Sequence, residues 1–348
     1  MKLAFCLFNY FPYGGLQRDF LRIANLAAKH GHQIDVYTMS WQGERPNFLT
    51  IHLIPVKSLS NHQRCLSFIK ALQIKLQSTH YDKIVGFNKM PGLDIYYAAD
   101  GCFVTKPQYY WNLFKYLTRR YYVFKNLEKT VFTPQSKTKI LLLSETEMCK
   151  YQAVYKPPKE RLYLLPPGIT KACIPPPNVN EIRTQIRSSL NISNEEFLLI
   201  TIASSFHTKG IDRVIKSLKA LPQVLQNKAK LMIVGQDNPK PYLKLATSIA
   251  EKILFLGARD DIPNLLFAAD LLLHFARIDN TGTVILEALI AGTPVIATDI
   301  CGYAPYINIA KAGIIIPSFK QLTANQALVK ALNPNTIKEW HYHALAYS

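Results

Sequence analysis

Residues 271–298 read LLLHFARIDNTGTVILEALIAGTPVIAT and contain the pattern that decides the fold. The apolar run at 271–274 predicts a strand, the apolar spacing of 283–291 predicts a helix, and 294–298 predicts a second strand. Because a loop and a helix separate the two strands, they favour a parallel pairing in which the helix covers one face of the sheet.

The same alternation continues along the rest of the chain. Further strands are expected, in chain order, at 3–8, 33–38, 83–86, 95–99, 140–143, 162–165, 197–203, 231–235, 253–256 and 313–317, and further helices at 16–29 and 211–221. Prolines cluster between Pro166 and Pro177, where they interrupt regular structure. We therefore predict an α/β protein of two Rossmann-like domains, residues 1–167 and 168–348, which face each other across a cleft that holds the active site.

The composition excludes several classes of protein. Of the 348 residues, 49% are hydrophobic and 18% are charged, so the chain can bury a sizeable core. Its apolar runs are far shorter than the ~18 residues that cross a membrane. The six cysteines form no CxxC pair, which argues against a zinc ribbon or a disulfide framework. These features favour a reduced, cytosolic protein.

The charge of the chain is concentrated in its first half. The formal net charge is +18, and residues 1–165 hold 23 basic and 10 acidic side chains, which is +13 of that total. A surplus confined to one half predicts a basic face. Its partner could be a nucleic acid, an anionic membrane or a phosphorylated substrate.

The segment 103–125, FVTKPQYYWNLFKYLTRRYYVFK, contains nine aromatic residues, five basic residues and no acid. Such a mixture is typical of the headgroup region of an anionic bilayer, and a packing helix with lysines extended to solvent is the alternative. Aromatic and basic residues also suit single-stranded nucleic acid, but no RRM, KH or zinc signature accompanies them, so we expect no nucleic-acid partner. The predicted membrane-binding residues are Tyr109, Tyr110, Trp111, Phe114, Lys115, Arg119, Arg120 and Lys125.

Three places in the sequence could carry chemistry. Gly15, in a Gly-Gly pair after the first strand, could let backbone N–H groups approach a phosphate, although a tight turn has the same sequence. Lys209, at a strand end, could neutralise a diphosphate or simply face solvent. Asp279 and Glu287 could accept hydrogen bonds from sugar hydroxyls, and a helix-face role is less expected for Glu287 because buried acids are rare without a partner.

Together these blocks carry a family resemblance. The chain resembles the family 4 glycosyltransferases of the GT-B fold, through the pattern acid-x7-Glu-Ala-x-x-Ala-Gly-x-Pro-Val at 279–295, the preceding Lys209-Gly210 pair and the N-terminal Gly-Gly loop. Within that family it is similar to the heptose α-1,3-glucosyltransferases of the lipopolysaccharide core, most densely in 4–20 and 86–94. The resemblance covers nearly the whole chain.

The resemblance implies a retaining transfer of a hexose, usually glucose from UDP-glucose, to a heptose of the lipopolysaccharide inner core. It implies no cofactor and no metal, in keeping with the absence of a DxD motif from the sequence. It also implies attachment to the cytoplasmic face of an inner membrane. The catalytic residues would be Asp19, Asp100, Lys209 and Asp279, and the nucleotide-sugar-binding residues would be Gly15, Lys209, Asp279, Gly282, Thr283 and Glu287.

The chain also departs from the family pattern. The first acid is usually Glu and is here Asp279, a family arginine is replaced by Thr208, and another arginine is matched by Cys173. The sequence stops at Ser348, before the long helix that ends such proteins. These departures leave two alternatives open, a transferase with a different donor and a membrane-docked nucleotide-sugar-binding protein that has lost turnover.

Overall fold

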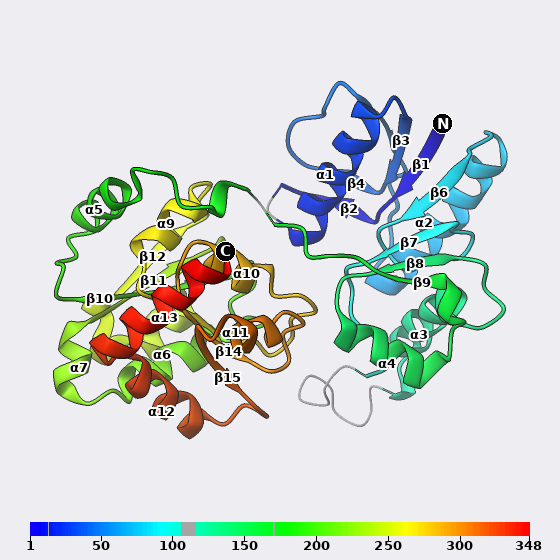
Figure 1. Cartoon of the computed structure of the whole chain (residues 1–348). Helices are drawn as coiled ribbons and strands as arrows, with labels where there is room; N and C mark the ends of the chain where they lie inside the picture. The colour runs from blue at the N-terminus through cyan, green and yellow to red at the C-terminus, as the bar shows by residue number, and fades with distance from the viewer. Residues whose placement is uncertain (13, 106–115, 170) are drawn as a thin grey trace. The chain divides into compact units, whose positions relative to one another are not determined.

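A computed structural model describes residues 1–12, 14–105, 116–169 and 171–348. The chain forms two compact units, which we call unit 1 (Met1–Pro166) and unit 2 (Pro167–Ser348). In Figure 1 unit 1 runs from blue to green and unit 2 from green to red. The division lies at the start of the proline cluster.

Unit 1 alternates strands with helices. Its strands are β1 (Lys2–Cys6), β2 (Asn9–Tyr10), β3 (Gln33–Thr38), β4 (Ser40–Trp41), β5 (Leu49–Leu53), β6 (Lys83–Gly86), β7 (Ile95–Ala98), β8 (Lys139–Leu142) and β9 (Leu162–Leu164). Its helices are α1 (Gly15–Lys29), α2 (Asn61–Gln77), α3 (Arg119–Phe132) and α4 (Glu145–Tyr155), followed by a 3₁₀ turn at Lys159–Arg161.

Within the described part of unit 1, seven strands form a parallel sheet in the order β5-β3-β1-β6-β7-β8-β9. The sheet is buried on both faces, as parallel sheets are. On β1, Ala4 and Cys6 pack into one apolar cluster while Leu3 and Phe5 pack into the other. The chain leaves β1 towards β3 on one side and later returns to β6 on the other, so the strand order reverses between β1 and β6.

Unit 2 repeats this plan. Its strands are β10 (Phe197–Ile202), β11 (Ala229–Val234), β12 (Ile253–Gly257), β13 (Leu271–His274), β14 (Val295–Thr298) and β15 (Gly313–Ile316). Its helices are α5 (Val179–Ser189), α6 (Ile211–Lys219), α7 (Gln223–Lys228), α8 (Lys240–Leu245), α9 (Ile262–Ala268), α10 (Thr283–Ile290), α11 (Pro305–Ala310), α12 (Gln321–Ala331) and α13 (Pro334–Tyr347), with 3₁₀ turns at Lys171–Cys173 and Thr247–Lys252.

The six strands found among the described residues of unit 2 form a parallel sheet in the order β12-β11-β10-β13-β14-β15. Its central strand alternates in the same way, since Leu198 and Ile200 pack on one face and Leu199 on the other. Here the strand order reverses between β10 and β13. The prediction of two α/β Rossmann-like units is confirmed.

The strand positions follow the sequence closely, whereas some of unit 1 was not predicted. The strands at 33–38, 83–86 and 271–274 have the predicted bounds. Helix α2 and the edge strand β5 were missed, although α2 buries Cys65, Phe68, Ile69 and Leu72 at helical spacing. Across the described residues, none of the helices combines the length and the apolar character that a bilayer span requires.

Candidate active site

The first cluster of predicted site residues lies at the carboxyl ends of β10 and β13. These two strands are neighbours in the sheet, and they flank the point where the strand order reverses. Ligands of doubly wound sheets bind at such a point, beyond the carboxyl ends of the strands. A turn at 205–210 follows β10 and a loop at 275–282 follows β13, so parallel pairing brings the two segments together.

The turn and the loop are fastened to each other. Gly210 has φ +73°, and a Cβ built there would lie 2.0 Å from the carbonyl oxygen of Phe275, so only glycine fits. The backbone N–H of Arg277 donates to Thr208 O at 2.8 Å. The Arg277 guanidinium also donates two hydrogen bonds of 2.6 Å to the Asp212 carboxylate. These two hydrogen bonds between charged groups fix the loop against the start of α6.

Lys209 and Asp279 meet at this junction. Lys209 Nζ lies 2.5 Å from Asp279 Oδ2, and His274 Nε2 lies 2.7 Å from the same oxygen. Because a carboxylate can only accept, Nε2 of His274 is the donor. The backbone N–H of Gly282 donates to Asp279 Oδ1 at 3.0 Å. Three donors therefore converge on one carboxylate.

The surroundings of Asp279 keep it ionised. Burial by itself would raise the pKa of this carboxyl group, but the positive charge of Lys209 and the hydrogen bond from His274 outweigh burial. The pKa of Asp279 is consequently held well below its usual range. The side chain of Asp279 is 9% exposed and that of Lys209 is 20% exposed, so the pair is shielded but still reached by solvent.

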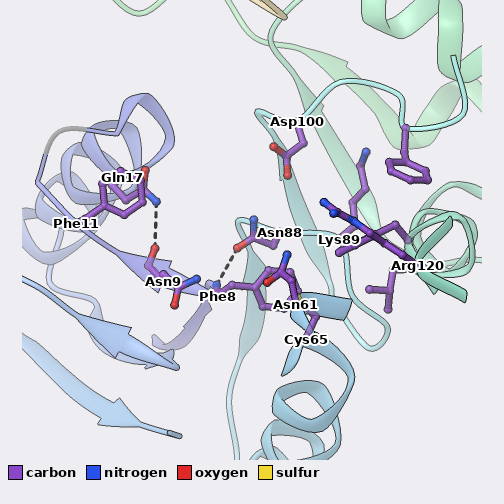
Figure 2. A pocket seen from close by; sticks show the side chains of 13 residues that line it. Phe8, Asn9, Phe11, Gln17, Asn61, Cys65, Asn88, Lys89, Asp100 and Arg120 are labelled. Atoms are coloured by element: carbon purple, nitrogen blue, oxygen red, sulfur yellow. Dashed lines mark hydrogen bonds between the residues drawn. The ribbon is translucent and has the colours of Figure 1, made fainter. Parts of the chain in front are cut away.

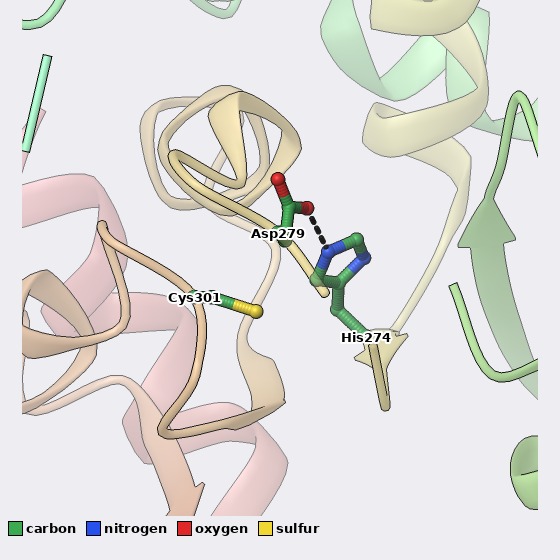
Figure 3. A group of neighbouring side chains, drawn as sticks. All are labelled: His274, Asp279 and Cys301. Carbon is green, nitrogen blue, oxygen red and sulfur yellow. Dashed lines mark hydrogen bonds and ion pairs between the residues drawn. The ribbon is translucent and has the colours of Figure 1, made fainter. Parts of the chain in front are cut away.

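His274, Asp279 and Cys301 form a group whose potential metal-ligand atoms lie within 4.8 Å of one another (Figure 3). This group does not suit a metal ion. The ammonium of Lys209 already lies against the carboxylate that would bind the ion, and burial raises the pKa of the Cys301 thiol, which keeps the sulfur protonated.

The remaining predicted residues of this cluster lie on α10. Gly282 has φ +74° and precedes the helix, and Thr283 is its first residue. Glu287 is buried one turn further along the same helix. The helix is otherwise apolar, and the backbone N–H groups of its first turn add positive charge near Asp279.

A second cluster forms a pocket of about 330 Å³ within unit 1. It lies at the carboxyl ends of β1 and β6, where the order of that sheet reverses. Its lining includes Phe8 and Asn9 beyond β1, Asn88 and Lys89 beyond β6, and Asp100 beyond β7 (Figure 2). The first turn of α3 contributes Arg120 to the same lining.

The predicted residues of unit 1 have different surroundings. Asp100 lines the pocket. Asp19, on α1, accepts hydrogen bonds from Tyr97 Oη at 2.9 Å and from Arg22 Nη2 at 3.3 Å. Gly15 begins α1, and a Cβ built there would meet no heavy atom of the described chain within 4 Å. The backbone at Gly15 is therefore open to a ligand.

The predicted membrane segment is described only in part. Tyr109, Tyr110, Trp111, Phe114 and Lys115 lie outside the described residues. The other three predicted residues are on α3, where Arg119 and Arg120 stand at the exposed start. The Arg120 guanidinium lies 5.8 Å from the Phe124 ring centre, and the Lys125 ammonium lies 5.8 Å from the Tyr121 ring centre.

Sequence reasoning missed His274, Asn88 and Lys89 as site residues. His274 ends a strand and stands five residues before Asp279, so its position was a usable signal. Asn88 and Lys89 lie two and three residues after the end of β6, and polar residues just beyond a central strand of a parallel sheet indicate the edge that holds the site. The strand order, once known, marks His274, Asn88 and Lys89 as residues at the site edge of their sheets.

Comparison with known proteins shows the family. The family described as "Glycosyl transferases group 1" matches residues 182–342. The chain is also 40% identical, over 355 aligned residues, to the lipopolysaccharide glucosyltransferase WaaG of Escherichia coli (strain K12), an alignment that covers 100% of this chain and 94% of WaaG. The chain belongs to this family of glycosyltransferases. The predicted glycosyltransferase assignment is confirmed.

Solved glycosyltransferase structures show the same architecture. The crystal structure of WaaG, described as a glycosyltransferase involved in lipopolysaccharide biosynthesis, matches with a TM-score of 0.93 and 39% identity over 99% of this chain and 94% of WaaG. Anabaena HepE, solved with UDP-glucose, matches with a TM-score of 0.71 and 18% identity over 99% of this chain and 94% of HepE. The HepE likeness shows the shared fold, and the WaaG match confirms the predicted GT-B class for this glycosyltransferase.

Proposed function

We propose that this glycosyltransferase moves glucose from UDP-glucose to a heptose of the lipopolysaccharide core, with retention of anomeric configuration and without a metal ion. The observation that carries the proposal is the 40% identity to WaaG over the full chain. The reaction breaks the bond between the glucose anomeric carbon and the diphosphate, forms a bond from that carbon to an acceptor hydroxyl oxygen, and releases UDP and a proton.

The cluster at Lys209 supports a donor site in unit 2. A carboxylate offers about four lone-pair positions, and three donors already use Asp279, which leaves one position for a hydroxyl of the donor hexose. Lys209 supplies a fixed positive charge for the diphosphate as it becomes the leaving group. In other enzymes a metal ion supplies this positive charge. The presence of Lys209 therefore supports a reaction without a metal ion. Glu287 is assigned to the ribose hydroxyls, with Gly282 and Thr283 beside it.

The residues of unit 1 support the remaining roles. Gly15 offers open backbone to the diphosphate, while Asp19 and Asp100 are assigned to donor or acceptor hydroxyls. The aromatic and basic segment 103–125 is assigned to an anionic inner-membrane surface, with the protein peripheral on its cytoplasmic side. Basic residues near such a surface contribute about 1 kcal/mol each, which suits reversible attachment.

The test is transfer by the purified chain. UDP-glucose is incubated with a de-acylated, heptose-terminated core saccharide, and mass spectrometry detects the gain of one hexose. NMR of the product then gives the anomeric configuration, and a rate unchanged by EDTA supports a reaction without metal. Transfer from another UDP-sugar at a higher kcat/KM than from UDP-glucose would refute the donor assignment.

A second candidate is a binding protein without turnover, which the replacement of two family arginines by Thr208 and Cys173 favours. Calorimetry with UDP and measurement of UDP release from UDP-glucose separate the two. A binding protein binds UDP but releases none from the donor, with or without acceptor, whereas the proposed enzyme releases one UDP for each hexose transferred.

A further inference from the structure

The pocket of unit 1 is built to donate hydrogen bonds. The side-chain Oδ1 of Asn88 accepts from the backbone N–H of Phe8 at 2.8 Å, so its NH₂ group is the part left for a ligand. Asn9 is fixed in the same way, because its Oδ1 accepts from Ser40 Oγ at 2.8 Å. Both amides line the pocket with their donor ends available.

Lys89 adds a positioned ammonium to the same lining. Its Nζ donates to Gly101 O at 2.8 Å and lies 2.5 Å from Glu128 Oε2. The Lys89 side chain is 10% exposed and the Glu128 side chain is fully buried. An ammonium has three N–H bonds, and these two are its hydrogen-bond acceptors among the described residues. One N–H of Lys89 therefore remains for a ligand.

Glu128 is held too firmly to be a ligand group itself. Besides Lys89, its carboxylate accepts from the backbone N–H of Phe103 at 2.7 Å, from Tyr155 Oη at 2.8 Å and from Cys102 Sγ at 3.6 Å. Its charge is thus spread over four donors in the interior of unit 1. The effect of this arrangement is to hold the Lys89 ammonium in one position.

Arg120 brings a second cation to the pocket from α3. Among the described lining residues, these two cations stand with the amides of Asn9, Gln17, Asn61 and Asn88 and with one carboxylate, Asp100. We infer that this pocket binds a carboxylate or phosphate substituent of the acceptor saccharide, with Arg120 and Lys89 contacting its oxygens and Glu128 acting as the positioning residue of Lys89. The inference rests on the proposed function, in which the acceptor is a saccharide.

The chemistry of the lining favours an anion over a neutral sugar. A guanidinium binds carboxylate and phosphate oxygens in pairs, and an ammonium adds a point charge. A neutral polyol would leave these donors with weaker acceptors. Asp100 can accept a hydrogen bond from a sugar hydroxyl of the same acceptor, which gives this carboxylate a role among the cationic side chains.

The test measures binding of the de-acylated core saccharide to the full chain by calorimetry, without donor. Three saccharides are compared: the intact one, one stripped of phosphate with hydrofluoric acid, and one whose carboxyl groups have been reduced to alcohols. For the parent chain, loss of the recognised group is expected to weaken binding about ten-fold or more. The saccharide that loses affinity identifies the source of the anion.

Arg120→Gln is expected to weaken binding of the intact saccharide about ten-fold. It should also abolish the difference in affinity between the intact saccharide and the saccharide that lacks the recognised anionic group (the neutralised saccharide). Lys129→Gln, which removes the same charge from an exposed position on α3, is the matched control and should behave as the parent. Glu128→Gln should shrink the difference between the intact and neutralised saccharides. A merely structural role of Glu128 would weaken both saccharides equally.

Two results would overturn the inference. One is a parent chain that binds all three saccharides equally. The other is an Arg120→Gln variant that keeps the full preference for the anionic form. Glucose transfer is scored separately with the parent chain. Anion-dependent binding without glucose transfer would refute the proposed function and leave the pocket assignment in place. Glucose transfer without anion-dependent binding would refute the pocket assignment and leave the proposed function in place.

Discussion

The two clusters lie at equivalent places in two similar sheets, yet they are assembled differently. Each is at the point where the strand order of a parallel sheet reverses, next to β10 and β13 in unit 2 and next to β1 and β6 in unit 1. The unit 2 cluster comes from the turn after β10, the end of β13, the loop that follows β13, and α10. The unit 1 pocket draws on segments spread from Phe8 to Leu127.

This difference teaches how each cluster depends on the fold. In unit 2 the hydrogen bond from Gly282 N–H to Asp279 is local, whereas the Arg277–Asp212 and Lys209–Asp279 pairs join residues 65 and 70 apart. In unit 1 the key ion pair joins Lys89 to Glu128, 39 residues apart. Lys209 and Asp279 are themselves assigned to the donor, so single substitutions in unit 2 should change the chemistry directly. In unit 1, Glu128 should instead act through the position of Lys89.

Lys209→Ala should have the largest effect. Under the proposed function it removes the cation at the diphosphate, and loss of one such electrostatic stabiliser costs about 10²–10³-fold in kcat. Steady-state kinetics with UDP-glucose measures this, and KM should change less. Lys219→Ala, an exposed lysine at the end of α6, is the control. A fall in kcat below ten-fold would mean that another group neutralises the leaving group.

The sequence predicted unit 2 better than unit 1 for a physical reason. Asp279, Gly282 and Glu287 lie within nine residues on a loop and a helix, so their spacing alone placed them on one edge. Lys209 was predicted because it lies between a predicted strand at 197–203 and a predicted helix at 211–221. His274 was missed because a histidine in an apolar run resembles a core residue.

In unit 1 the sequence alone predicted only some of the residues that line the pocket. Asp100 was predicted, but the pocket around it depends on strand order, which pairs β1 with β6 although 76 residues separate Cys6 from Lys83 along the chain. Arg120 was assigned to the membrane because its neighbours in sequence are aromatic and basic. Its place in the pocket lining follows from the packing of α3, which composition does not encode.

Asp279→Asn should give the next largest effect, on stability. Since the pKa of Asp279 is lowered in the folded chain, its ionised form stabilises the fold above the unfolded-chain pKa of about 3.9. That stabilisation is lost as the pH falls from there through the folded-state pKa. Breaking a buried ion pair costs about 3 kcal/mol, so we expect this gap between parent and variant at pH 7.

Denaturant unfolding between pH 3 and pH 7 tests this expectation, and the gap should narrow only below about pH 4. Asp260→Asn, at an exposed position of unit 2, is the control and should show no such gap. A gap for Asp279→Asn that stays constant from pH 7 to pH 3 would mean that the loss comes from packing and not from the charge.

Glu287→Ala should weaken UDP binding about ten- to hundred-fold. A hydrogen bond to a charged group contributes roughly 1.5–3 kcal/mol, and the proposed function gives Glu287 the ribose hydroxyls. Titration calorimetry with UDP measures the change. Glu251→Ala, at an exposed position of unit 2, is the control. Unchanged UDP affinity in a folded Glu287→Ala variant would make Glu287 a residue of the helix interior only.

Arg119→Gln should have the smallest effect and would separate the two roles given to the start of α3. Neutralising one basic residue near an anionic bilayer costs about 1 kcal/mol, or about five-fold in the partition coefficient measured by vesicle co-sedimentation. Lys338→Gln, which makes the same change of charge at an exposed position of unit 2, should have no effect. Salt should weaken binding of the parent, because surface attraction is screened within about 10 Å at 0.1 M. If Arg119→Gln pellets with anionic vesicles as well as the parent and instead weakens saccharide binding, the start of α3 serves the pocket and not the membrane.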